Sequence, residues 1–170
     1  MMKNQSSPVT YRWTMLFVAT LIIFVHSFVF QSVPPVMGEL IQDLDLSYKQ
    51  LGGLMGAYSL PGALLSIMAG VLAERFGSLK IGTAGLLSLL IGTVLVAMSA
   101  CYGLLTFGRV VGGAGAAVLF VVAPVAVNSW FARQEIGLAM GIYNIAIPGG
   151  TILAFNLLGP IAGEHGWQSA

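Results

Sequence analysis

Charged residues are scarce in this sequence. Lysine and arginine together number 7, and aspartate and glutamate 6, so 8% of the 170 residues are charged, against roughly 25% in a soluble domain. The net charge of +1 excludes a strongly basic surface of the kind that binds nucleic acid. The single cysteine, Cys101, excludes an intramolecular disulfide and a cysteine metal cluster. A soluble fold of this size could not cover a chain that is 57% hydrophobic, so we expect a membrane protein.

Signatures of enzymes are also missing. The sequence contains no phosphate-binding loop of the Walker type, which gives no support for direct ATP drive. The glycine-rich run 112–115 lies inside an apolar segment, where the strand-to-helix turn of a dinucleotide site does not form. His26 and His165 lie on different segments without metal-ligand spacing. We therefore expect no cofactor, no metal ion and no enzymatic reaction.

Five apolar runs are long enough to cross a bilayer as helices, which requires about 20 residues each. The predicted spans are 12–33, 48–73, 79–99, 102–127 and 137–159. Pro34 and Pro35 are expected to end the first span, and Pro160 follows the fifth. Residues 36–50 have the pattern of a short amphipathic interfacial segment, after which Ser47 is placed to cap the second span. The sequence thus predicts an all-α, polytopic membrane helix bundle that forms a single transmembrane domain over residues 1–170.

Positive residues are distributed unevenly between the two ends of the predicted helices. One side carries five, and the other carries only Lys49; the five are Lys3, Arg12, Arg75, Lys80 and Arg133. Lysine and arginine accumulate on the cytoplasmic side of membrane proteins. We therefore expect a cytoplasmic N-terminus in a multi-pass protein, and the short loops fit a bacterial inner membrane.

Small residues recur four positions apart within the spans. Such pairs let helix backbones approach closely in lipid, where no hydrophobic force drives helices together. The pairs are Gly52 and Gly56, Gly108 and Gly112, Gly113 and Ala117, and Gly137 and Gly141. We expect these positions to mark the helix contacts.

Three motifs follow one another along the chain. Gly70-x-x-x-Glu74-Arg75-x-Gly77-x-x-Lys80 joins the second and third spans. Arg109-x-x-x-Gly113-x-Gly115-x-Ala117 lies in the fourth, and Glu135-x-Gly137-x-Ala139-x-Gly141 opens the fifth. Together they resemble the signatures of the major facilitator superfamily over essentially the whole chain. The resemblance implies helices one to five of an N-terminal six-helix half, truncated before helix six and lacking the C-terminal half.

The resemblance also implies roles for particular residues. A cytoplasmic gating motif would latch one state of the carrier through Gly70, Glu74, Arg75, Gly77, Lys80 and Arg133, with Glu74 accepting from a helix end or from Arg133. The alternative is an ordinary turn with cationic anchors. Helix packing would involve Gly113, Gly115, Pro148 and Gly149. The residues around Pro148 differ from the motif of glycine and proline that is associated with antiporters of this family, so we infer no antiport.

Polar residues within the spans are candidates for a substrate or proton cavity. Arg109 either holds an anionic substrate in the cavity or bonds structurally to backbone carbonyls, because a charge inside a span must face protein or water. His26 lies at the same depth and either titrates or bonds between helices. Gln31 and Asn144 complete the candidate set, and Tyr58, Tyr143 and Asn156 are further polar groups.

These observations favour secondary active or facilitated transport of a small solute by alternating access. No carboxylate lies in the middle of a span, which favours an anionic or neutral substrate over an organic cation. The expected partners are the lipid bilayer, the solute, a coupling proton if transport is proton-driven, and the missing C-terminal half. The alternatives are a non-transport scaffold or sensor, and a non-functional fragment.

Overall fold

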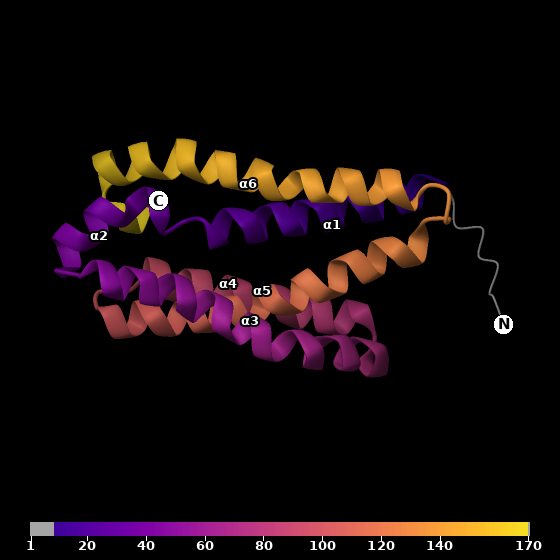
Figure 1. The fold of residues 1–170 in the computed structure, drawn as a ribbon, viewed down its shortest axis with the longest axis horizontal. Coiled ribbons are helices and arrows are strands. Elements are labelled where there is room, and N and C mark those ends of the chain that lie inside the picture. The colour runs from indigo at the N-terminus through magenta and orange to yellow at the C-terminus, as the bar shows by residue number, and fades with distance from the viewer. Residues whose placement is uncertain (1–8, 170) are drawn as a thin grey trace.

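The computed structural model describes residues 9–169, where five helices are long and apolar enough to cross a membrane. They run side by side along the long axis of the molecule (Figure 1). Their bounds are α1 Val9–Phe30, α3 Tyr48–Phe76, α4 Ser78–Ala97, α5 Tyr102–Trp130 and α6 Ile136–His165. Because no strand occurs between residues 9 and 169, the predicted all-α membrane bundle is confirmed. Lys3, which contributed to the predicted orientation, lies outside the described residues.

One end of the bundle carries the short elements. A 3-10 turn, η1 (Pro34–Val36), leads into the helix α2 (Met37–Leu44), which lies at the end opposite the start of α1 (Figure 1). Leu40 of α2 is buried, as an interfacial helix with one apolar face requires. Ser47 caps α3 as predicted: its hydroxyl accepts from the Gln50 backbone N–H, and the Gln50 side chain accepts from the Ser47 N–H at 2.8 Å.

The last helix continues beyond residue 159, where we expected the fifth span to end. It passes through Pro148 and Pro160 and ends at His165, followed by Gly166 with a φ of +83°. Proline removes one backbone hydrogen bond, but a membrane helix tolerates this because other groups satisfy the freed carbonyl. A second 3-10 turn, η2 (Trp167–Ser169), then folds back so that Trp167 is buried against the end of the bundle.

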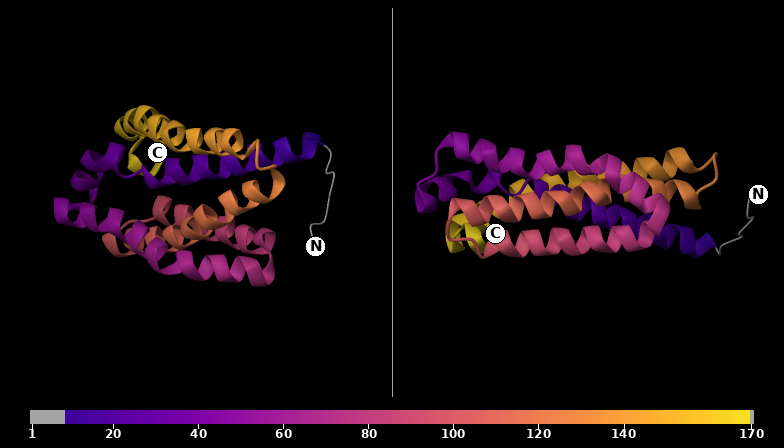
Figure 2. Two further views of the ribbon diagram at one scale, coloured as in Figure 1. Left: turned by 45° about the vertical axis from the view of Figure 1, so that its right-hand side comes forward. Right: turned by 90° about the horizontal axis from the view of Figure 1, so that it is seen from below.

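The helices form two groups. α3, α4 and α5 pack together most extensively, while α6 packs along α1, and α5 also contacts α1. Figures 1 and 2 show the α1–α6 pair lying along one side of the three-helix group. α5 therefore lies at the junction of the two groups, and it contributes the largest number of buried residues among the described helices.

Glycines produce the closest contacts around α5. A Cβ atom at Gly113 would overlap the carbonyl group of Tyr58 in α3. A Cβ at Gly115 would overlap the Gly85 carbonyl in α4, and one at Gly92 in α4 would overlap the backbone of Gly112. These three helices can approach this closely only because the contact positions lack side chains.

The contact between α1 and α6 is built in the same way. A Cβ at Gly150 would lie 2.5 Å from the Phe24 carbonyl oxygen, and one at Gly149 would lie 3.3 Å from the Phe24 ring. Beside them the Ser27 hydroxyl donates to the Ile147 carbonyl at 2.7 Å. This bond crosses between the helices immediately before Pro148, which is itself exposed.

Other glycine pairs that we expected to mark contacts do not do so within the described part of the chain. A Cβ at Gly52, Gly56, Gly137 or Gly141 would meet no atom within 4 Å. At Gly70 it would meet only Val121, at an ordinary 3.9 Å. The four-residue spacing of small residues is therefore not sufficient to identify a contact, because it does not show which way the helix face points.

Candidate functional site

Arg109 reaches from α5 to the end of α1. Its guanidinium donates from Nη1 to the Val29 carbonyl at 3.0 Å and from Nη2 to the Phe30 carbonyl at 3.3 Å. α1 ends at Phe30, where a cation is favoured at the helix C-terminus, and the Val29 carbonyl also accepts from the backbone N–H and the hydroxyl of Ser32. The residue is only 2% exposed. Of the two roles that we considered for Arg109, the structure shows the bonds to backbone carbonyls.

Tyr58 of α3 connects Arg109 with His26. The Arg109 Cζ lies 4.8 Å from the centroid of the Tyr58 ring, a cation–π distance. The Tyr58 hydroxyl lies 3.4 Å from Nδ1 of His26. The two residues that the sequence placed at one depth are thus joined through a third. The sequence indicated Tyr58 only as one polar residue among several in the spans, because depth alone does not show which helix faces meet.

A cavity of about 330 Å³, here called the central cavity, lies between α1, α3 and α5. Its polar lining residues are His26, Tyr58, Ser59 and Ser66, and its apolar ones include Phe120. Within residues 9–169, His26 is the one lining residue that can carry a positive charge, and no carboxylate lines the cavity. This wall can accept a small solute between aromatic rings and a titratable imidazole.

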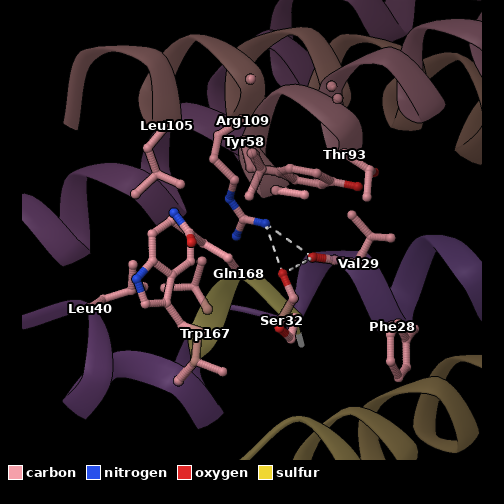
Figure 3. Close-up of a pocket in the computed structure, with 18 residues that line it drawn as sticks. Phe28, Val29, Ser32, Leu40, Tyr58, Thr93, Leu105, Arg109, Trp167 and Gln168 are labelled. Carbon is pink, nitrogen blue, oxygen red and sulfur yellow. Dashed lines mark hydrogen bonds between the residues drawn. The ribbon is translucent and has the colours of Figure 1, made fainter. Parts of the chain in front are cut away.

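A second cavity of about 190 Å³, here called the end cavity, lies toward α2 and the C-terminal turn. Arg109, Ser32 and Thr93 line it, together with Trp167 and Gln168 of η2 (Figure 3). Tyr58 lines both cavities. The roles of Trp167 and Gln168 could not be predicted from the sequence, since both residues follow the last predicted span.

Two of the predicted cavity residues lie elsewhere. Gln31 is half-buried in the turn after α1 and lines neither cavity. Asn144 is exposed on α6, and its side chain donates to the Met140 carbonyl of its own helix at 2.8 Å. The structure therefore brings His26 and Arg109 together but not these two residues.

The predicted gating motif lies in the turn between α3 and α4. Gly77 has a φ of +92°, which glycine adopts without strain and which lets α4 begin at the next residue. Arg75 places its Cζ 5.5 Å from the centroid of the Phe76 ring, and Lys80 is exposed. The expected contact between Glu74 and Arg133 is not formed: both are exposed, and neither has an ion pair within residues 9–169.

An ion pair that we did not predict lies at the same end of the bundle. Arg12 of α1 donates through both terminal nitrogens to Glu135, at 2.6 and 3.1 Å. Its Cζ also lies 5.6 Å from the centroid of the Phe131 ring. The pair ties the start of α1 to the connection between α5 and α6. The sequence placed both charged residues on one side of the membrane, but several basic residues on that side could have paired with Glu135.

Comparison with known proteins places these observations in a family. The model of the Major Facilitator Superfamily matches residues 19–170. A probable nitrate transporter, NarT, of Staphylococcus carnosus is 29% identical over 154 residues, which cover 91% of this chain and 39% of that protein. The protein of the same name from Staphylococcus haemolyticus is 27% identical over 150 residues, covering 88% and 38%. The chain thus spans about two fifths of the length of these relatives.

The family match extends over nearly the whole chain, and it includes the second half of α1 and the four other membrane-length helices of the described residues. It agrees with the resemblance inferred from the three motifs. The chain is a multi-pass integral membrane protein, and it belongs to the major facilitator superfamily, a family of transporters rather than enzymes.

Proposed function

We propose that this chain forms part of a carrier that moves a small solute across the membrane by alternating access. The observation that carries the proposal is the central cavity between α1, α3 and α5, which lies beside the middle turns of α3 and α5 in a member of a transporter family. The chain spans about two fifths of the length of its relatives. The rest of the protein, a C-terminal half, would then supply the opposite wall of the pathway.

His26 is the residue that we propose to meet the solute or a coupling proton. It lines the central cavity, and its ring packs near Phe120, with centroids 5.9 Å apart. Arg109 has a supporting role in this proposal, because it fixes the end of the same helix. Gln31 and Asn144 would contact the solute only if they face the remaining part of the carrier.

The proposed solute is a small anion, with nitrate as the first candidate. Relatives of this chain are named probable nitrate transporters. A protonated His26 would provide the positive charge of the wall, and no lining carboxylate among the described residues would oppose an anion. A neutral solute of similar size is the alternative, and it would need only the hydroxyl groups of the wall.

We further propose that the end with the α3–α4 turn is cytoplasmic, in a bacterial inner membrane. Arg75, Lys80 and Arg133 are exposed at this end, where they can contact lipid phosphates. The gating motif would latch this end in one state of the carrier, with Glu74 free to pair with the remaining part of the protein. The ion pair between Arg12 and Glu135 would hold α1 to α6 as one rigid unit during the movement.

The test is transport by the full-length protein reconstituted in vesicles. Nitrate uptake should be saturable, and His26→Gln should abolish it without changing the amount of folded protein. His165→Gln is the matched control, because His165 is exposed at the end of α6 and should leave uptake unchanged. Uptake of a neutral solute but not of nitrate would overturn the proposed anion. A folded protein that transports none of the solutes tested would favour a scaffold or sensor.

A further inference from the structure

Arg109 carries a buried charge without a counter-ion. It forms no ion pair within residues 9–169, and the acceptors of its terminal nitrogens are two carbonyls, the Ser32 hydroxyl and the Met55 sulfur, all neutral. The C-terminal end of α1 supplies roughly half an elementary negative charge. A buried charge is normally fully paired, because burial in a low dielectric is costly. Part of the charge of Arg109 therefore remains uncompensated.

One donor of the guanidinium also remains unused. Nε of Arg109 is buried and has no hydrogen-bond partner among the described residues. Because the terminal nitrogens already contact their acceptors and Nε has almost no accessible surface, a ligand beside the guanidinium would be held mainly through its positive charge. An unsatisfied buried donor on a charged group usually indicates an ion or water that completes the site.

The end cavity provides the space for such a ligand. Figure 3 shows the guanidinium of Arg109 extending from α5 into the region where Trp167 and Gln168 of η2 also lie. The Gln168 Nε2 donates to the Ser99 carbonyl at 3.2 Å, which leaves its second amide hydrogen for another acceptor. Apolar residues such as Leu40 and Leu105 form much of the remaining wall. Such walls lower the local dielectric and strengthen an attraction between opposite charges.

We propose that the end cavity binds a small monovalent inorganic anion as the counter-ion of Arg109. The volume of about 190 Å³ exceeds the roughly 30 Å³ that one water occupies in the liquid, so an ion the size of chloride or nitrate fits with some of its hydration. The single positive charge of Arg109 favours an anion that carries one negative charge, and the limited volume of the cavity excludes large organic anions. The site differs from the central cavity, because the two cavities share only Tyr58 among their lining residues, and it does not depend on which solute the carrier moves.

Trp167 supplies a direct probe, because it lines the end cavity. Bromide quenches tryptophan fluorescence on contact. Fluorescence of the full-length protein in detergent should be recorded while sodium bromide replaces sodium gluconate at constant ionic strength. Subtracting the signal of a Trp167→Phe variant isolates the contribution of this residue. We expect saturable quenching that chloride and nitrate reverse by competition. Quenching that rises linearly without saturation would overturn the proposal.

Two variants separate anion binding from folding. Gln168→Leu leaves the contacts between Arg109 and α1 intact, and it should raise the half-saturating bromide concentration roughly three- to tenfold, the effect of one lost hydrogen bond. Arg109→Gln should abolish saturation in the fraction that remains monodisperse on gel filtration. Unchanged half-saturation in Gln168→Leu would show that the ion does not lie in the end cavity.

The source of the anion is identified by competition between chloride and nitrate in the same fluorescence assay. A counter-ion from the solvent should bind equally well as chloride or nitrate, and binding should persist in His26→Gln. A transported anion on its way through the protein should bind as nitrate in preference to chloride. Because the fluorescence assay measures binding without transport, failure of the proposed carrier function would leave its result unaffected.

Discussion

The contact between Gly113 and Tyr58 should determine whether α3 and α5 can pack at all. Gly113→Ala adds a Cβ that would lie 2.8 Å from the Tyr58 carbonyl carbon and 2.9 Å from its Cα, in addition to overlapping the carbonyl oxygen. Ordinary van der Waals contact begins at 3.4 Å. The neighbouring atoms belong to helix backbone and cannot rotate away. The two helices must therefore separate by at least about half an ångström, the difference between these distances.

The magnitude follows from comparison with the adjacent glycine. Overpacking of a close-packed core costs about 1–3 kcal/mol. Gly112→Ala adds a Cβ with only ordinary contacts at 3.7 Å, to Tyr58 and Gly92. Both substitutions gain the same preference of alanine over glycine for the helical conformation, about 1 kcal/mol in water. This gain cancels in the comparison, so Gly113→Ala should be about 1–3 kcal/mol less stable than Gly112→Ala.

The free energy of unfolding should be measured for both variants of the full-length protein by titrating sodium dodecyl sulfate into mild-detergent micelles. Helical circular dichroism reports the unfolded fraction. We expect Gly112→Ala to match or slightly exceed the original protein and Gly113→Ala to unfold at a lower mole fraction of the denaturing detergent. Equal stabilities for the two variants would refute the steric reasoning and the close approach of α3 and α5.

Substitutions at three further contacts can be tested by the same titration. Arg12→Gln and Glu135→Gln should each lower the free energy of unfolding, and a double-mutant cycle should give a coupling of about 0.5–1 kcal/mol, as for a partly exposed ion pair; strictly additive losses would argue against the pair. Ser27→Ala should cost about 0.6–1.7 kcal/mol, because it removes an interhelical bond in lipid, and a change below a few tenths would show that the bond contributes nothing. Trp167→Ala should cost about 3–5 kcal/mol. The exposed Trp13 should tolerate the same change, and equal losses would mean that η2 does not cover the end cavity.

Hydropathy was sufficient to predict the helices because lipid permits few alternatives. A run of about 20 apolar residues must satisfy its backbone hydrogen bonds internally, so it forms a helix. The same reasoning misplaced the end of α6. A proline at a position such as 160 commonly ends a helix in a soluble protein, where solvent competes for the backbone. Inside this bundle the helix continues past Pro160 to His165. The signal that marks the true end is Gly166, which adopts a positive φ.

Contacts between helices were less predictable than the helices themselves. Sequence spacing gives the depth of a residue, and on this basis His26 and Arg109 were placed at one level. It does not give the rotation of each helix about its axis, so Tyr58 between them was not identified as their common partner. For the same reason the sequence could not choose among the cations near Glu135, and only the fold identifies Arg12 as its partner.

The end of α1 shows how two distant features of the sequence act together. Pro34 and Pro35 follow shortly after α1 stops at Phe30, and its last carbonyls point into the bundle rather than toward bulk water. Buried carbonyls without donors would make such an early end unfavourable. Arg109 provides a donor to the Phe30 carbonyl from another helix, and it shares the Val29 carbonyl with Ser32. This contact fixes the level at which α1 ends, and the rigid helix in turn fixes His26 against Tyr58. A residue that resembles a substrate ligand in the sequence can therefore control the shape of the central cavity without lining it.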